Sequence, residues 1–152
     1  MNAPAENPDR AARRAELVAA LARVLPREAI LSRREDTVPY ECDGLTAYRA
    51  TPLVVVLPTT EAQVAAVLKT CHALKAPVVA RGAGTGLSGG ALPHEMGVTL
   101  SLARFNRILK IDPAARTAVV QCGVRNLAIS EAAAHYGLYY APDPSSQIAC
   151  TI

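Results

Sequence analysis

The sequence lacks the features that mark several common classes of protein. Its longest apolar runs, such as Leu53–Leu57, are far shorter than the roughly 20 residues that a membrane-spanning helix needs. It has no block of Lys and Arg, and its formal net charge is only +3, so the charge pattern does not favour nucleic-acid binding. Residues 1–10 include Pro4 and Glu6 and no apolar core, so we expect no secretory signal there.

Metal and redox motifs are also missing. The three histidines have no partner at metal-ligand spacing, and no two cysteines lie close together, so we expect neither a metal site nor a disulfide. No Gly-x-Ser-x-Gly pattern points to acyl transfer. We expect four free cysteines with structural roles, the second of them on the apolar face of a helix: Cys42, Cys71, Cys122 and Cys150.

The composition itself is that of a folded protein. Hydrophobic residues make up 51% of the 152 residues, which argues against intrinsic disorder. A chain of this length suits one domain that buries roughly 70% of the surface of the unfolded chain.

Hydrophobic periodicity predicts three helices. The first runs from an Asp9 cap to Leu25, with Arg10, Arg13 and Arg14 facing solvent, and the polar residues 31–50 after it read as an ordered loop. The second begins at a capping box formed by Thr60 and Gln63 and buries a set of apolar side chains. This set comprises Val64, Val67, Leu68, Cys71 and Leu74. The third is capped by Asn126 and closed by Gly137.

Five strands are predicted between and after these helices. The first is a β-branched run that we expect to be buried on both faces. It forms a βαβ unit with the second helix and the second strand, which predicts parallel strands and a right-handed crossover. The last two strands are expected to form a hairpin. The five predicted ranges are 53–57, 78–81, 98–102, 108–112 and 117–121.

A glycine-rich loop follows the second strand. Five glycines in nine residues allow the backbone to take positive φ and to approach a ligand closely. Successive N–H groups of such a loop can converge on phosphate oxygens, and the Thr85 and Ser88 hydroxyls and the Arg81 charge can add to the site.

Two well-known phosphate-binding motifs do not fit this loop. Gly84, Gly86 and Gly89 satisfy the dinucleotide-binding pattern Gly-x-Gly-x-x-Gly, but a strand follows where an NAD-binding Rossmann unit needs a helix. A Walker motif fails because no Lys follows Gly89 or Gly90. A plain turn between two strands remains an alternative, although such turns need fewer glycines.

The last fourteen residues contain a second candidate loop. Pro142 and Pro144 restrict the backbone on both sides of Asp143, and two serines follow with hydroxyl donors. The chain ends on the apolar, strand-like Cys150, Thr151 and Ile152, and we expect the motif to continue beyond them.

Together the two loops resemble those of the FAD-linked oxidase family, whose fold is that of vanillyl-alcohol oxidase and p-cresol methylhydroxylase. Within this family the sequence is similar to the FAD-binding catalytic subunits of bacterial glycolate oxidases, which are related to D-lactate and D-2-hydroxyglutarate dehydrogenases. The resemblance begins near Ile30 and is carried by four segments: Glu41–Arg49, Val79–Leu92, Val119–Ile129 and Tyr139–Ile152.

The resemblance implies an α+β chain with the FAD-binding fold of the p-cresol methylhydroxylase type, its βαβ first lobe complete and its second lobe truncated. Residues 1–50 would be an N-terminal helix and ordered loop, and residues 51–152 the first part of the FAD-binding domain, without the substrate cap domain. The implied FAD contacts are Arg81, Gly82, Ala83, Gly84, Thr85, Gly86, Leu87, Ser88, Gly89, Pro142, Asp143, Pro144, Ser145, Ser146, Cys150, Thr151 and Ile152. No catalytic side chain is assigned.

The implied activity is FAD-dependent oxidation of a 2-hydroxy acid, glycolate or D-lactate, to the 2-oxo acid. Electrons would pass to a partner, with a second flavin-type subunit and an iron–sulfur subunit as expected partners in the cytoplasm or at the inner membrane. We expect residues 1–152 alone to be inactive and only marginally stable. The alternative function is a non-catalytic nucleotide- or phosphate-binding module.

Overall fold

A four-stranded sheet forms the centre of the first lobe in the computed structural model, which describes residues 7–152. β2 (Val54–Val56) is fully buried, as its unbroken β-branched sequence predicts. β4 (Val98–Ser101) pairs in parallel with β2 on one side and with β3 (Val78–Arg81) on the other. β1 (Ile30–Leu31) adds an antiparallel strand beyond β2.

The predicted βαβ unit is confirmed as β2, α3 (Glu61–Ala73) and β3, but its two strands are not neighbours. β4 lies between them, and all three strands run in the same direction. The Thr60 hydroxyl accepts a hydrogen bond from the Gln63 N–H at 3.2 Å, as expected of a helix cap. The Gln63 side chain reaches back to the N–H of Thr59 rather than that of Thr60. Leu68, expected in the core, is 45% exposed because it lies beyond the stripe formed by Val67 and Cys71.

α1 (Pro8–Leu21) is shorter than predicted and begins at a different cap. The Asn7 side chain, not that of Asp9, caps it, and it accepts a hydrogen bond from the Asp9 N–H at 2.9 Å. The predicted end at Leu25 is wrong because the chain tightens after Leu21 into i→i+3 turns. Pro4 and Glu6, on which the expectation about a secretory signal depends, lie outside the described residues.

Two of the α1 arginines do not face solvent as expected. Arg10 donates to the carbonyl oxygens of Glu95 at 2.7 Å and Thr51 at 3.0 Å. Arg13 donates to the carbonyl of Leu74, which follows the last residue of α3. These long side chains therefore tie α1 to carbonyl groups of three later segments of the chain.

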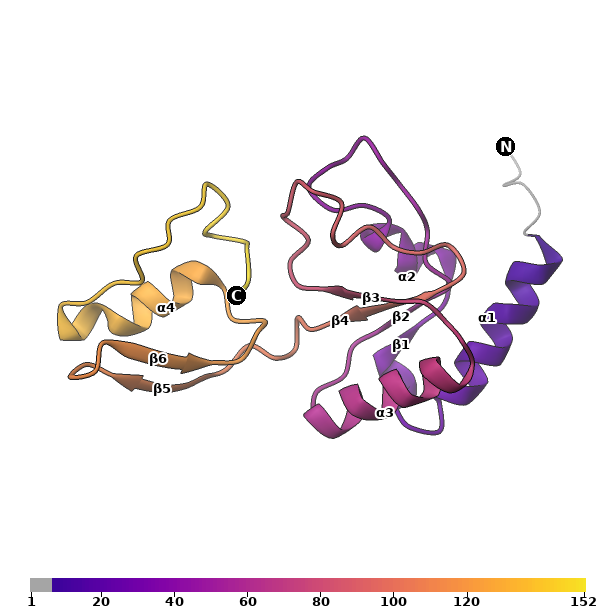
Figure 1. The fold of residues 1–152 in the computed structure, drawn as a ribbon, viewed down its shortest axis with the longest axis horizontal. Helices are drawn as coiled ribbons and strands as arrows, with labels where there is room; N and C mark the ends of the chain where they lie inside the picture. Colours follow the sequence, from indigo (N-terminus) through magenta and orange to yellow (C-terminus); the bar gives the residue numbers. More distant parts are fainter. Residues whose placement is uncertain (1–6) are drawn as a thin grey trace.

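One hydrophobic core joins α1 to the sheet and to α3, and Figure 1 shows α1 and α3 beside the strands. Since α1 residues and sheet residues share this core, α1 is an integral part of the first lobe. Buried members include Leu17, Leu21, Leu25, Ala29, Leu53, Val54, Val56, Val67, Cys71, Val98 and Leu100. No helix among the described residues is both long and apolar enough to cross a membrane.

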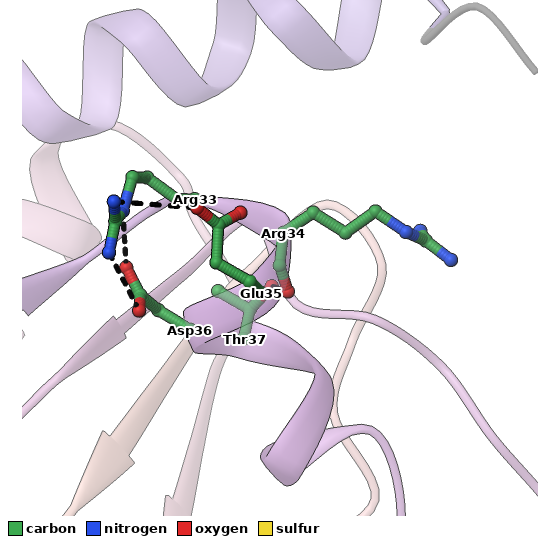
Figure 2. A network of polar contacts seen from close by, with 5 residues as sticks. All are labelled: Arg33, Arg34, Glu35, Asp36 and Thr37. Atoms are coloured by element: carbon green, nitrogen blue, oxygen red, sulfur yellow. Dashed lines mark hydrogen bonds and ion pairs between the residues drawn. The ribbon is translucent and has the colours of Figure 1, made fainter. Parts of the chain in front are cut away.

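The predicted loop at 31–50 is partly helical. It contains α2 (Arg34–Thr37) and a 3₁₀ turn at Val38–Tyr40. Figure 2 shows Arg33 between two carboxylates: it makes a two-pronged contact with Asp36 at 2.8 and 3.2 Å and an ion pair with Glu35 at 3.4 Å. The hydrogen bond from Arg33 lowers the pKa of the Asp36 carboxyl. These exposed ion pairs connect the residue before α2 to its first turn, and they contribute little to the free energy of unfolding.

The second lobe consists of a hairpin and a helix. β5 (Ile108–Asp112) and β6 (Thr117–Val120) pair antiparallel, which confirms the predicted hairpin, and α4 (Asn126–Ala133) lies over them in Figure 1. Gly137 closes the following turn at φ 69°, as predicted. Asn126 is not the cap that we expected: it is the first helical residue, and Arg125 holds the cap position.

Candidate functional site

The two loops singled out in the sequence meet in the structure. The glycine-rich loop is residues 82–90, and the proline-serine loop is residues 142–152. The N–H of Ala83 donates to the Thr151 hydroxyl oxygen at 3.2 Å. A side chain at Gly82 would overlap the same hydroxyl. Figure 1 shows the C-terminal segment returning from the second lobe toward the first, so this contact joins the two lobes.

The remaining glycines of the glycine-rich loop fall into two groups. Gly84 and Gly89 have φ of 74° and 73°, which favour glycine because they lie in the left-handed region. Gly86 and Gly90 have neither a positive φ nor any atom within 4 Å of an added Cβ. The chain itself therefore does not require glycine at 86 or 90, and both leave open space beside the backbone.

The backbone donors of the glycine-rich loop are largely free of protein partners. Among the described residues, the N–H groups of residues 84–90 donate to no protein acceptor. The loop carbonyl of Gly89, in contrast, accepts from the N–H of Leu92 at 3.1 Å. Leu87 is 72% exposed, and Ser88 is exposed beside it. The loop thus offers a run of donors and a hydroxyl to an acceptor-rich ligand.

Arg81 lies differently from what the sequence suggested. Its guanidinium packs under Gly84 and donates to the Cys42 carbonyl oxygen at 2.6 Å. It also lies 5.6 Å from the centre of the Tyr40 ring. Residues 40–44, which we did not assign to the site, therefore contact its first loop, and no side-chain motif marks them because the contact uses a backbone carbonyl.

Asn126 organises the proline-serine loop and was missed as a site residue. Its side-chain amide donates to the Pro142 carbonyl at 3.1 Å, and its N–H donates to the Cys150 carbonyl at 3.0 Å. Its side-chain oxygen is buried and has no partner among the described residues. Ile152 donates its N–H to the Val124 carbonyl at 3.1 Å. The start and the end of the loop are thus both tied to the start of α4.

The middle of the proline-serine loop is a series of turns. The Pro144 carbonyl accepts from the N–H of Gln147, and the Ser146 carbonyl accepts from that of Cys150, both at 2.8 Å. Asp143, Pro144 and Ser145 are exposed. The Ser145 hydroxyl therefore lies on the surface of the lobe, within reach of a ligand, while Ser146 is half-buried.

One hollow of the second lobe is lined by neither of the two loops. A cavity of about 300 Å³ lies between the hairpin and the segment after α4, and none of the implied FAD contacts lines it. Its apolar walls include Ile111, Ile129, Leu138 and Tyr140. The candidate site is therefore the surface where the loops meet.

The cysteines and acidic residues give no second kind of site. All four cysteines are free, as predicted. Burial raises the pKa of the Cys71 thiol, so this side chain behaves as a small apolar group. No cluster of His, Cys, Asp and Glu that could hold a metal ion occurs within residues 7–152.

Residues 52–152 match the protein family described as FAD binding domain. The chain belongs to this FAD-binding family. The match supports FAD as the cofactor, as the sequence motifs predict. It spans β2 to the end of the chain and thus contains both loops.

Curated relatives place the chain more closely. It is 61% identical over 139 residues to the glycolate oxidase subunit GlcD of Escherichia coli K12. The matched residues make up 91% of this chain and 28% of the relative. It is 39% identical to GlcD of Bacillus subtilis, over 74% of this chain and 24% of the relative. A D-lactate dehydrogenase of Archaeoglobus fulgidus is also 39% identical, over 72% of this chain and 25% of the relative. The chain spans about a quarter of the length of these relatives.

Solved structures confirm the predicted fold class. The chain superposes on p-cresol methylhydroxylase with a TM-score of 0.72 at 27% identity, over 84% of this chain and 25% of that one. Alkyldihydroxyacetonephosphate synthase shares the fold with a TM-score of 0.77 at 19% identity, over 99% of this chain and 31% of that one. The mixed helix and sheet arrangement is thus that of the p-cresol methylhydroxylase type.

The residues present fit the diphosphate of FAD. Phosphate oxygens are acceptors, and residues 84–90 supply backbone donors that no described protein group uses. Gly86 and Gly90 leave the space that a ligand needs to approach those donors. Hydrogen bonds to a charged acceptor contribute about 1.5–3 kcal/mol each, so a few of them suffice for useful binding.

Proposed function

We propose that this chain forms the diphosphate-binding part of an FAD-dependent 2-hydroxy-acid oxidoreductase, with residues 51–152 as the first part of the FAD-binding domain. The observation that carries the proposal is the free run of N–H donors at residues 84–90, beside the contact between Ala83 and Thr151. The similarity to glycolate oxidase subunits and to a D-lactate dehydrogenase supports glycolate or D-lactate as the substrate.

In this proposal the two loops hold the cofactor from two sides. The glycine-rich loop donates backbone hydrogen bonds to the diphosphate through Gly84–Gly89, with Thr85 and Ser88 hydroxyls as further donors. The proline-serine loop lines the cleft through Pro142–Ser146 and Cys150–Ile152. Bound FAD supplies the redox chemistry by accepting a hydride from the 2-hydroxy acid, while the protein supplies binding and orientation.

Glycine substitutions test the diphosphate site. Gly86→Val places a side chain in the open space beside the free donors, and we expect it to raise the FAD dissociation constant at least tenfold in a flavin titration. Because no atom of the chain lies within 4 Å of an added Cβ, the unfolding free energy of the apoprotein is expected to stay unchanged. Unchanged flavin retention by Gly86→Val would overturn the assignment of this loop.

Gly137→Ala is the matched control. Gly137 has φ of 69° and lies after α4, outside both loops. We expect this substitution to lower stability by about 1 kcal/mol through backbone strain while leaving FAD affinity unchanged. Loss of FAD affinity in Gly86→Val and loss of stability in Gly137→Ala would distinguish a glycine that binds a ligand from one that only shapes the backbone.

Substrate reduction of the flavin tests the reaction. Under anaerobic conditions we expect glycolate or D-lactate to remove the absorbance of the oxidised flavin in the holoprotein. A protein that keeps FAD and is reduced by neither acid would overturn the proposed substrate class. A protein that binds inorganic phosphate or a nucleotide but not FAD would favour the non-catalytic binding module.

The proposal extends to partners that take up the electrons. We propose a second flavin-type subunit and an iron–sulfur subunit, located in the cytoplasm or at the inner membrane through these partners. The word subunit in the names of the two GlcD relatives supports a multi-subunit enzyme. Affinity purification of the tagged protein from its own cells, followed by iron analysis and mass spectrometry, is the test; a protein isolated without such partners would contradict it.

A further inference from the structure

The backbone of Gly44 runs directly against the glycine-rich loop. A Cβ added at Gly44 would lie 2.7 Å from the Thr85 carbonyl oxygen and 2.8 Å from that of Gly86. Backbone atoms at such distances cannot move aside as a flexible side chain would. The segment Tyr40–Gly44 therefore packs against the loop at Thr85 and Gly86, whose N–H groups are among the free donors.

Arg81 connects the same segment to the start of the loop. Its Nη1 donates to the Cys42 carbonyl at 2.6 Å, and its guanidinium lies 5.6 Å from the Tyr40 ring centre, within the range of a cation–π contact. The turn at Gly84 passes over the guanidinium so closely that any side chain there would overlap it. The guanidinium is thus already enclosed by a carbonyl, a ring and the loop backbone.

The supporting segment also makes hydrogen bonds to the residues that follow it. The buried Asp43 side chain accepts a hydrogen bond from the N–H of Leu45 at 2.9 Å. The N–H of Ala50 donates to the Glu41 carbonyl at 2.8 Å, and Arg49 forms an ion pair with the Glu41 carboxylate. These contacts close residues 41–50 into a loop of fixed shape. A fixed base of this kind can hold a glycine-rich loop in one conformation.

We propose that Arg81 is a positioning residue that fastens the glycine-rich loop to the segment Tyr40–Gly44, and that it does not bind the diphosphate. The inference rests on the proposed FAD function, because it concerns the same loop. It adds to the cofactor site a segment that precedes residues 52–152, the part that matches the FAD-binding family. It also replaces the sequence-based expectation that the Arg81 charge is directed at the phosphates.

The two roles predict different responses to substitution. An arginine that binds the diphosphate acts through its charge. In that case Arg81→Lys would keep most of the affinity for FAD, and Arg81→Met would weaken the salt dependence of FAD binding. A positioning residue acts through the planar fork that reaches Cys42 and stacks on Tyr40, which lysine does not reproduce. For a positioning residue, loss of the Tyr40 ring and loss of the Arg81 guanidinium disrupt the same contact, so their effects on FAD affinity do not add.

The first experiment measures FAD dissociation constants by flavin fluorescence over a salt series. We expect Arg81→Lys, Arg81→Met and Tyr40→Leu each to weaken FAD binding on the order of tenfold, with unchanged salt dependence. The double variant Y40L/R81M is expected to be no weaker than R81M alone, and Tyr40→Phe, which keeps the ring, to bind as the wild type does. Near wild-type affinity of Arg81→Lys, with reduced salt dependence of Arg81→Met, would overturn the proposal.

The matched control is Arg34→Met. The Arg34 side chain is exposed on α2 and extends away from the ion-pair network in Figure 2. The substitution removes one positive charge, as Arg81→Met does, without touching the segment or the loop. We expect it to leave the FAD dissociation constant unchanged. If Arg81→Met fails to fold, the Tyr40 variants and Arg81→Lys still decide the question.

The second experiment does not depend on FAD. Amide hydrogen exchange of the apoprotein reports on the segment through the N–H groups of Leu45 and Ala50, both of which are hydrogen-bonded. We expect Arg81→Met to accelerate their exchange severalfold and Arg34→Met not to. Unchanged exchange in Arg81→Met would overturn the positioning role. If the wild-type protein binds no FAD, the proposed function fails while this measurement still tests the contact.

Discussion

The Thr151 hydroxyl oxygen accepts a hydrogen bond from the backbone N–H of Ala83 at 3.2 Å, although 68 positions separate the two residues in the sequence. This contact connects a loop of the first lobe to a segment that is anchored on the second lobe. It also removes the Ala83 N–H from the donors that are available to a ligand. The free donors therefore begin at Gly84, and Thr151 sets how the two loops lie against each other.

Replacement of Thr151 tests this connection. Thr151→Val removes the acceptor and leaves the shape of the side chain nearly unchanged, so we expect FAD to bind about three- to tenfold more weakly, the equivalent of one net hydrogen bond of about 0.5–1.5 kcal/mol. Thr151→Ser, which keeps the hydroxyl, is expected to bind FAD as the wild type does. Thr117→Val, at an exposed threonine on β6, is the control. Equal FAD affinity of the Val and Ser variants at 151 would contradict the prediction.

Gly82 is predicted to depend on the same hydroxyl. A methyl group at Gly82 would overlap the Thr151 oxygen, so Gly82→Ala forces that side chain to rotate and breaks its bond to Ala83. We expect Gly82→Ala to weaken FAD binding in the wild-type background and to have little effect in a Thr151→Ala background, where the overlap is gone. The measurement is a double-mutant cycle on FAD affinity. Additive effects would show that Gly82 acts independently of Thr151.

Cysteine reactivity is predicted to separate the core from the surface. Cys71 is 1% exposed, and burial raises the pKa of its thiol, so little reactive thiolate is present. Cys122 is exposed. With a thiol-alkylating reagent and peptide mapping, we expect Cys122 to be modified in the native protein and Cys71 only after addition of denaturant. Equal modification rates in the native state would show that the α3 face is open.

Strands β2 to β6 could be predicted because their signals are local, whereas the two-residue strand β1 was not predicted. β-Branched runs between prolines and glycines define β2 and β3, and each lies where expected within a residue or two. The position of β4 between them could not be predicted, since long-range pairing decides the order of parallel strands. The prediction of the α1 cap failed for a related reason: Asn7 and Asp9 are both good caps, and spacing alone does not choose between them.

The candidate site also has a part that could be predicted from the sequence and a part that could not. Glycine content alone located the glycine-rich loop, because an excess of glycine is visible in the sequence. The support from residues 40–44 was not predictable, since apart from the Tyr40 ring it consists of the Cys42 carbonyl and the close approach of Gly44 to two loop carbonyls. Backbone contacts of this kind leave no pattern of side chains. Asn126 was assigned a local capping role because its distant partner, the Pro142 carbonyl, cannot be inferred from spacing.

Asp112 is predicted to make the stability of the hairpin depend on pH. The N–H of Ala115 donates to its carboxylate at 3.0 Å, and Lys110 donates at 2.9 Å. The backbone bond first, and Lys110 second, lower the pKa of Asp112 in the folded protein. Because the folded pKa lies below the unfolded value of about 3.9, the carboxylate stabilises the fold above that pH, and the contribution is lost as pH falls through the folded pKa.

Asp112→Asn is therefore expected to unfold at lower urea concentration than the wild type at pH 7, and the difference is expected to shrink progressively below about pH 4. The effect is small because the pair is exposed to solvent, so the comparison needs urea midpoints at several pH values. Glu131→Gln, at an exposed carboxylate on α4, serves as the control for loss of one negative charge. A stability difference between Asp112→Asn and the wild type that persists undiminished at acid pH would show that the ionised form of Asp112 is not what stabilises the turn.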